Sequence, residues 1–200
     1  MSDGPKPPAR AGHVSPRPPG PRELPPPSLV VLGVLAGDMD GARRMAERFG
    51  EAYGGVDLWG EPAPFDQTGY YEAEMGGQLQ RFYCSCVELV PSEGLGELKR
   101  RAWELEQQEL DGGRRRVNLD PGLLDHTKVV LASFKSGPQK LHLGGGIWAD
   151  MVLYYAGGAY GPLPWTFPDL RGGDHSRFFS EARRRFKERL RQRGRLAGDP

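Results

Sequence analysis

Residues Ser28–Leu35 read SLVVLGVL, a run of strand length that contains no charged side chain. A strand with one face in water alternates polar and apolar residues, whereas a strand buried on both faces is continuously apolar. We therefore predict that this segment is a central strand of a sheet and that the folded domain begins with it.

The 27 residues that precede this run have a different composition. They contain ten of the 19 prolines and almost no large apolar side chains. Such a segment cannot bury enough apolar surface to offset the entropy that folding removes. We expect residues 1–27 to be a disordered, partly polyproline-II leader, or alternatively a proline-rich ligand for an aromatic groove. Residues 28–200 are then long enough for a single domain.

The formal net charge of +1 conceals an uneven distribution. Residues 1–27 carry four basic and two acidic side chains, residues 28–173 carry 14 and 20, and residues 174–200 carry nine and four. No apolar run approaches the roughly 18 residues of a membrane helix, and the first residues lack the apolar part of a secretory signal. The two cysteines are too few for a disulfide framework. These features predict a cytoplasmic protein with no membrane partner.

The rest of the pattern alternates strands and helices. Clusters of β-branched and aromatic residues predict strands at 28–35, 56–59, 79–90, 115–119 and 129–134, and two more within 140–155. Apolar residues at helical spacing predict helices after Asp38, near Leu95 and from Ser176. The order strand–helix–strand–strand–helix–strand is that of a split βαβ sandwich. We predict an α+β fold with a mainly antiparallel sheet, appended hairpins and a basic amphipathic helix at the C-terminal end.

Three local predictions follow from the same pattern. Lys99 and Glu106 belong to the charged residues that we place on the outer faces of the second helix. Asp120-Pro121-Gly122 is predicted to be a turn that ends a short strand, because these residue types favour turns. Cys84 and Cys86, two apart on a strand, are predicted to be half-buried core thiols.

The densest group of polar residues lies in the connection between two strands at residues 65–76. Its candidate site residues are Asp66, Thr68, Tyr70, Tyr71 and Glu74. Carboxylates, a hydroxyl and aromatic rings with polar tips, displayed on a loop above a rigid scaffold, are typical of a binding site. The alternative is a well-ordered connector in which Asp66 forms a turn and the tyrosines pack beneath it.

A second group surrounds the predicted turn. Asn118 and Asp120 are two apart, so their side chains point to the same side of an extended chain. Lys128 begins the next predicted strand and is expected close to them. An amide, a carboxylate and an ammonium group together suit a phosphate or carboxylate ligand. The alternative is ordinary turn chemistry with Lys128 in solvent.

A third group surrounds the glycines Gly144–Gly146. Their amides can form an anion-binding nest, or they can be the flexible tip of a hairpin. His142 and Asp150 flank these glycines, and they form an acid–base pair if the hairpin brings them together.

More specific motifs are absent from the sequence. Gly37–Gly41 lacks the lysine and the hydroxyl of a P-loop, and no GxGxxG motif opens a helix. There is no GxSxG elbow of an α/β-hydrolase. Cys84 and Cys86 lack the further cysteines or histidines that a zinc site requires. The sequence thus predicts no metal site and identifies no cofactor.

Four motifs occur in a recognisable order. They are PFDQT at 64–68 with YY at 70–71 and EMG at 74–76, RVNLDPG at 116–122, KVVLA at 128–132, and PWTFPD at 164–169. In these motifs the chain from Leu29 to the last helix resembles a bacterial family catalogued as domain of unknown function 4416. The resemblance implies membership of that family and implies no reaction. Some members of the family carry the description GTP-binding protein.

Two functions of different classes fit these residues. The first is the binding of a small anionic ligand, a nucleotide or a phosphorylated metabolite, in a cleft at strand ends lined by the residues of the first two groups. In an enzyme of this kind, Asp66 or Glu74 would be the general base and Lys128 would stabilise developing negative charge. The alternative is a non-catalytic interaction module that uses the basic last helix on RNA or on a protein partner.

Overall fold

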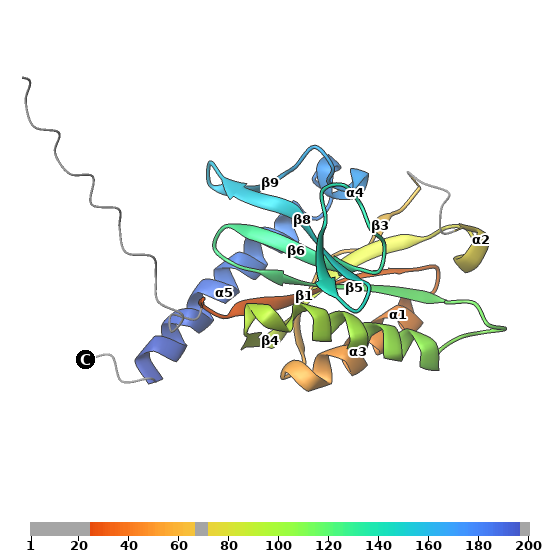
Figure 1. Cartoon of the computed structure of the whole chain (residues 1–200), viewed down its shortest axis with the longest axis horizontal. Coiled ribbons are helices and arrows are strands. Elements are labelled where there is room, and N and C mark those ends of the chain that lie inside the picture. Colours follow the sequence, from red (N-terminus) through yellow and green to blue (C-terminus); the bar gives the residue numbers. More distant parts are fainter. Residues whose placement is uncertain (1–24, 67–71, 197–200) are drawn as a thin grey trace, which may run out of the picture.

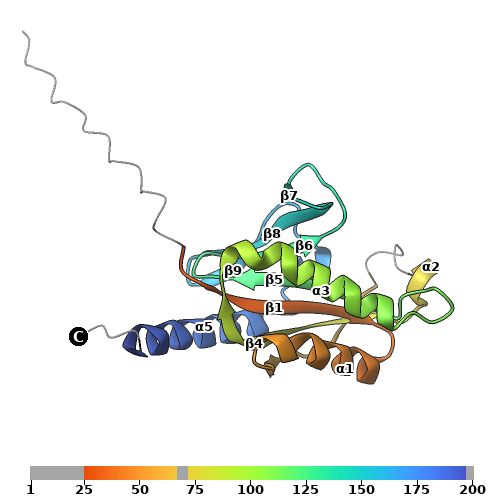
Figure 2. The ribbon, with the colours of Figure 1, turned by 60° about the horizontal axis from the view of Figure 1, so that its bottom comes forward.

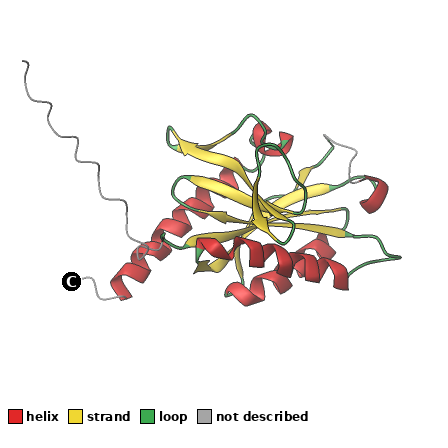
Figure 3. Cartoon of the chain, in the orientation of Figure 1, coloured by secondary structure: helices red, strands yellow, loops and turns green. Residues whose placement is uncertain are grey.

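The computed structural model describes residues 25–66 and 72–196, which form an antiparallel sheet with helices on both faces (Figures 1 and 3). The strands are β1 (Ser28–Ala36), β2 (Val56–Trp59), β3 (Ala63–Pro64), β4 (Gln80–Val90), β5 (Val117–Leu124), β6 (Lys128–Ser133), β7 (Leu141–Gly144), β8 (Ile147–Ala156) and β9 (Ala159–Pro162). The helices are α1 (Met39–Gly50), α2 (Glu72–Met75), α3 (Leu95–Gln108), α4 (Pro168–Gly172) and α5 (Ser176–Leu196). Short 3₁₀ turns at Glu51–Tyr53 and Ser92–Gly94 precede β2 and α3.

The strands follow the order β2-β4-β1-β5-β6-β8-β7, with β3 paired to β4 and β9 paired to β8. Every pairing between these strands is antiparallel. The first four strands in this order have the split βαβ arrangement, because β4 separates β2 from β1 and β1 separates β4 from β5. The predicted α+β class and mainly antiparallel sheet are confirmed.

Strand β1 lies at the centre of the sheet, and all nine of its residues are buried. Val30, Leu32 and Val34 point to one face, and Leu29 and Val31 point to the other. The continuous apolar run is therefore explained by two covering layers, as predicted.

Helices α1 and α3 lie side by side on the first face (Figure 2). Helix α1 begins where the Asp38 side chain accepts a hydrogen bond from the Asp40 N–H, and it buries Phe49. The prediction for the cysteines was wrong in degree: Cys84 and Cys86 are fully buried on this face. Their side chains lie between the sheet and the helices, because β4 is the inner strand next to β1 and the helices cover it there.

Helix α5 covers part of the second face. Its stripe of Phe178, Phe179, Ala182 and Phe186 packs against the other side of β1, β4 and β6. The predicted apolar seam of this helix is confirmed. None of the helices in the described part of the chain has both the length and the apolar content needed to cross a bilayer.

The predicted turn at Asp120–Gly122 was wrong, because β5 continues straight through it to Leu124. Pro121 is tolerated because the ladder between β5 and β6 begins only at Gly122, so no β6 partner requires the missing N–H. Gly122 is required because a Cβ there would lie 2.5 Å from the Val130 carbonyl oxygen. The reversal occurs at residues 125–127, which moves the start of β6 to the far end of β5.

Candidate functional site at the open end of β5

Strands β5 and β6 separate after a short ladder. Strand β5 pairs with β1 along its whole length, but its pairing with β6 covers only Gly122–Leu124. Strand β6 continues beyond that ladder with β8 as its partner. The edge of β5 from Val117 to Pro121 therefore faces no strand, and a cavity opens between the two strands at this place.

Side chains of α3 take the place of the missing strand. The Leu119 N–H donates to Glu106 Oε1 at 2.6 Å, and Lys99 Nζ donates to the Leu119 carbonyl oxygen at 2.7 Å. Both peptide groups are thus satisfied, as buried backbone requires. The prediction that Lys99 and Glu106 lie on the outer faces of the helix was wrong, since they are only 4% and 3% exposed. Burial raises the pKa of Glu106, although the nearby Lys99 ammonium opposes this shift.

The cavity has a volume of about 300 Å³. Three aromatic rings line it, those of Phe65, Phe134 and Phe167. Its two carboxylates are those of Asp120 and Asp150. Its five cationic side chains are those of Arg81, Lys99, Arg115, Lys135 and Lys140. The groups that line the cavity therefore carry more positive than negative charge, and carboxylates behind Arg81 and Arg115 offset part of this excess.

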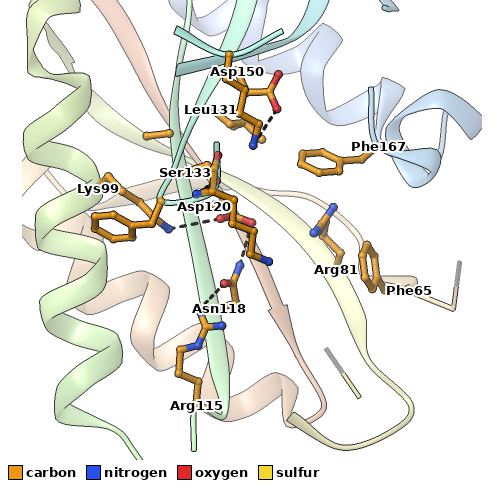
Figure 4. Close-up of a pocket in the computed structure, with 14 residues that line it drawn as sticks. Phe65, Arg81, Lys99, Arg115, Asn118, Asp120, Leu131, Ser133, Asp150 and Phe167 are labelled. Atoms are coloured by element: carbon orange, nitrogen blue, oxygen red, sulfur yellow. Dashed lines mark hydrogen bonds and ion pairs between the residues drawn. The ribbon is translucent and has the colours of Figure 1, made fainter. Parts of the chain in front are cut away.

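One wall is a continuous chain of polar contacts (Figure 4). Arg115 forms a two-bond ion pair with Glu74 of α2, with both N···O distances 2.7 Å. Arg115 also donates to Asn118 Oδ1 at 2.9 Å, and Asn118 Nδ2 donates to Asp120 Oδ2 at 2.8 Å. Lys99 Nζ lies 3.5 Å from Asp120 Oδ1. The hydrogen bonds from Arg115 lower the pKa of Glu74 below its ordinary value.

This wall joins parts of the two predicted groups. Glu74, which binds Arg115 from outside the cavity lining, comes from the first group, and Asn118 and Asp120 come from the second. The residue that connects them, Arg115, was missed by sequence reasoning, as was Lys99. Asn118 and Asp120 do share a side of β5, and both line the cavity.

The wall that faces Lys99 and Asp120 is built around Arg81 of β4 (Figure 4). Its guanidinium lies 4.3 Å from the ring centroid of Phe65 and 5.3 Å from that of Phe167. Asp169 accepts hydrogen bonds from it at 3.1 and 3.2 Å. Burial acts to raise the pKa of Asp169, but hydrogen bonding to His175 and the charge of Arg81 hold it below its ordinary value. The two rings and the carboxylate of Asp169 together hold the Arg81 guanidinium in one orientation.

Lys140 and Asp150, which both line the cavity, form a buried ion pair in which Lys140 Nζ lies 3.3 Å from Asp150 Oδ2. Burial raises the pKa of Asp150, and the charge of Lys140 opposes the rise. The predicted partner His142 lies elsewhere: it is opposite Trp148 in the β7–β8 register, with ring centroids 4.8 Å apart. Lys140, the residue directly before β7, reaches Asp150 with its ammonium instead. Thus Lys140, rather than His142, is the partner of Asp150.

The other predicted residues lie outside this cavity. Asp66 is exposed and lines a separate hollow with Gln78 and Gln80. Lys128 forms an ion pair with Asp125 and lines another cavity. Thr68, Tyr70 and Tyr71 lie outside the described residues.

The prediction that Lys128 lies beside Asn118 and Asp120 was wrong, and the cause is the misplaced turn. Because β5 runs on to Leu124, the hairpin places Lys128 at the opposite end of the strand from Asn118. The glycines Gly144–Gly146 form the turn between β7 and β8, all with positive φ, and they are not among the residues that line the cavity.

Many arginines of α5 have partners within the molecule. Arg185 and Arg189 both donate to Asp57 of β2, and Arg184 bonds Glu181 and Glu188 of the same helix. These contacts reduce the positive charge that the helix offers to a nucleic acid. The binding of RNA or of a protein partner by this helix stays a prediction.

Within residues 25–66 and 72–196, no three histidine, cysteine or acidic side chains converge into a group that could hold a metal ion. No curated protein and no solved structure matches the chain. Residues 26–186, which include every element from β1 into α5 that shapes the cavity, match the family model described as Domain of unknown function (DUF4416), and the chain belongs to this family.

Proposed function

We propose that the chain is a cytosolic protein that binds a small anionic ligand, a nucleotide or a phosphorylated metabolite, in the cavity between β5 and β6. The observation that carries this proposal is the lining of five cationic side chains against two carboxylates. A phosphate monoester has a charge of about −1.5 to −2 at neutral pH, and arginine and lysine are its usual partners. The volume is at the low end of the range for ligand pockets, which favours one phosphorylated unit over a dinucleotide.

The arrangement of the ion pairs supports the same proposal. The acidic partners of Arg81 and Arg115, which are Asp169, Glu74 and Glu106, are not among the residues that line the cavity. These carboxylates bind the guanidinium groups on the side away from the cavity, and the guanidinium groups themselves still line it. A ligand then meets cations whose orientation is already fixed, so less conformational entropy is lost on binding.

The proposal is binding rather than a defined reaction. Neither of the candidate bases is suited to proton abstraction in the cavity, because Glu74 has a lowered pKa in its pair with Arg115 and Asp66 lies outside. Asp150, with its raised pKa, is the cavity carboxylate better suited to exchange a proton. The cytosolic location is supported by the two cysteines, which are free and buried.

Isothermal titration calorimetry with AMP, ribose 5-phosphate and fructose 1,6-bisphosphate tests the proposal, with uncharged adenosine as the reference ligand. We expect at least one anion to bind, and we expect Lys135→Gln to weaken its binding by about tenfold or more, the effect of one hydrogen bond to a charged group. Lys128→Gln is the matched control, since Lys128 is a lysine at the other end of β5. Absence of binding by every anion, or equal weakening by the two substitutions, would contradict the proposal.

A further inference from the structure

Phe134 differs from the other two aromatic residues of the cavity. The rings of Phe65 and Phe167 lie against the guanidinium of Arg81. Phe134 follows directly after β6, lines the cavity and is 43% exposed. Part of an apolar ring is therefore accessible at the edge of a cavity that is rich in cations.

Exposure alone would mean little, because single exposed apolar side chains are common on protein surfaces. Trp103 of α3, for example, is 47% exposed and is not among the residues that line the cavity. What distinguishes Phe134 is its surroundings. Lys99 Nζ lies 5.6 Å from its ring centroid, and the next residue in the chain, Lys135, also lines the cavity.

An accessible ring next to ammonium groups is the combination that proteins use for ligands with both a flat π-system and a phosphate. The ring supplies a stacking surface and the cations bind the phosphate. A sugar phosphate would use the cations and leave the ring uncovered. Among the three rings of the lining, Phe134 is the one that does not pack against Arg81, so it is available for such a contact.

We infer that the ligand is a phosphate monoester that carries a flat aromatic ring, as a mononucleotide does, and that this ring stacks on Phe134. The inference rests on the proposed function, since it specifies the ligand class of the same cavity. It assigns Phe134 the role of a specificity-determining residue: the cations bind the phosphate of any such ester, and Phe134 selects those with a ring.

The test compares AMP with ribose 5-phosphate, which has the same phosphate and sugar but no ring. Calorimetry on the full chain should show AMP binding about tenfold more tightly, the usual contribution of stacking on one aromatic side chain. Phe134→Leu keeps an apolar side chain but removes the ring. It should weaken AMP about tenfold and leave ribose 5-phosphate unchanged, while Trp103→Leu should change neither.

The outcomes separate this inference from the proposed function. Equal affinity of wild type for AMP and ribose 5-phosphate would overturn the inference and leave the proposed function in place. An AMP preference that survives Phe134→Leu would also overturn it, because another residue would then recognise the ring. Binding of neither ligand would overturn the inference as well as the AMP and ribose 5-phosphate arms of the proposed function. The wild-type comparison decides the ligand class even where Phe134→Leu folds poorly.

Discussion

The backbone of β5 finds its hydrogen-bond partners in different ways at the two ends of the strand. At Gly122–Leu124 the strand lies between β1 and β6, and the backbone groups of the neighbouring strands pair on both sides. At Val117–Pro121 only β1 is present, and Lys99 and Glu106 of α3 bind the peptide groups of Leu119 instead.

The difference shows how a helix can satisfy backbone groups of a strand where the sheet has opened. At the paired end the two strands contact each other directly, and apolar side chains such as Leu124 and Val129 are buried there. At the open end a helix must supply one donor and one acceptor, which places charged groups inside the protein. Those groups and the gap left by β6 together produce a cavity with a cationic lining.

The largest expected effect is at the open end. Glu106→Leu removes the acceptor of the Leu119 N–H and leaves Arg115 with one carboxylate fewer, so we expect a loss of about 3 kcal/mol in the free energy of unfolding. Urea denaturation measures it. Glu97→Leu, on an exposed position of the same helix, is the control and should change stability by less than about 0.5 kcal/mol. Similar losses for the two variants would mean that β5 needs no substitute for β6.

The paired end should respond to volume instead. Gly122→Ala places a Cβ 2.5 Å from the Val130 oxygen and 2.6 Å from Leu131 Cδ2, so we expect a loss of about 2 kcal/mol. Gly161→Ala in β9 is the control, since the nearest atom there is 3.9 Å away. The same denaturation experiment applies, and a neutral Gly122→Ala would show that the two strands are not held closely at this end.

Two glutamates of the open end should give opposite pH dependences. The pKa of Glu106 is raised by burial, so its ionised form destabilises the fold increasingly as the pH rises through the folded-state pKa. The pKa of Glu74 is lowered by Arg115, so its stabilising effect is present above the unfolded-state pKa and is lost as the pH falls.

Denaturation between about pH 3 and pH 8 measures both effects. Relative to wild type, Glu106→Gln, which keeps an acceptor for Leu119, should gain stability as the pH rises above 4.5, on the order of 1 kcal/mol. Glu74→Gln should lose stability relative to wild type as the pH rises toward 4.5 from the acid side. Parallel curves for the two variants would contradict the assigned pKa directions.

The smallest effect is expected at Lys128. Its ion pair with Asp125 is partly exposed, so Lys128→Gln should change the free energy of unfolding by less than about 0.5 kcal/mol and leave anion affinity unaltered. Lys99→Gln, at the open end, should lower both. A loss of anion affinity in Lys128→Gln would place the anion near residues 122–128, and this would contradict binding at the open end of β5.

Much of the fold follows from local patterns in the sequence. The strand β1 has a continuous apolar run, the helices α1, α3 and α5 have regular apolar periodicity, and each element lies where its pattern predicts. The turn at Asp120–Gly122 was mispredicted because residue types that favour turns were placed in a strand by tertiary contacts: β1 on one side, and a β6 ladder that starts beyond Pro121. The sequence of β5 alone contains no pattern that shows at which residue its pairing with β6 begins.

The candidate site followed from the sequence only in part. Asn118 and Asp120 were predicted because their spacing alone places them on one side of a strand. Lys99 and Glu106 had a usable signal: both are within four residues of the buried Ala102, on the apolar stripe of α3. Arg115 had none, since its acidic partners Glu74 and Glu106 come from other elements and meet it only through the fold.

The location of the ligand is the central claim, and a two-dimensional ¹H–¹⁵N NMR titration of the full chain with AMP tests it directly. The account predicts that the largest amide shifts occur at the open end of β5 and after β6, at Leu119, Asp120, Phe134 and Lys135. Shifts confined to α5 or to the turn at residues 125–127, or no shifts at all, would contradict it.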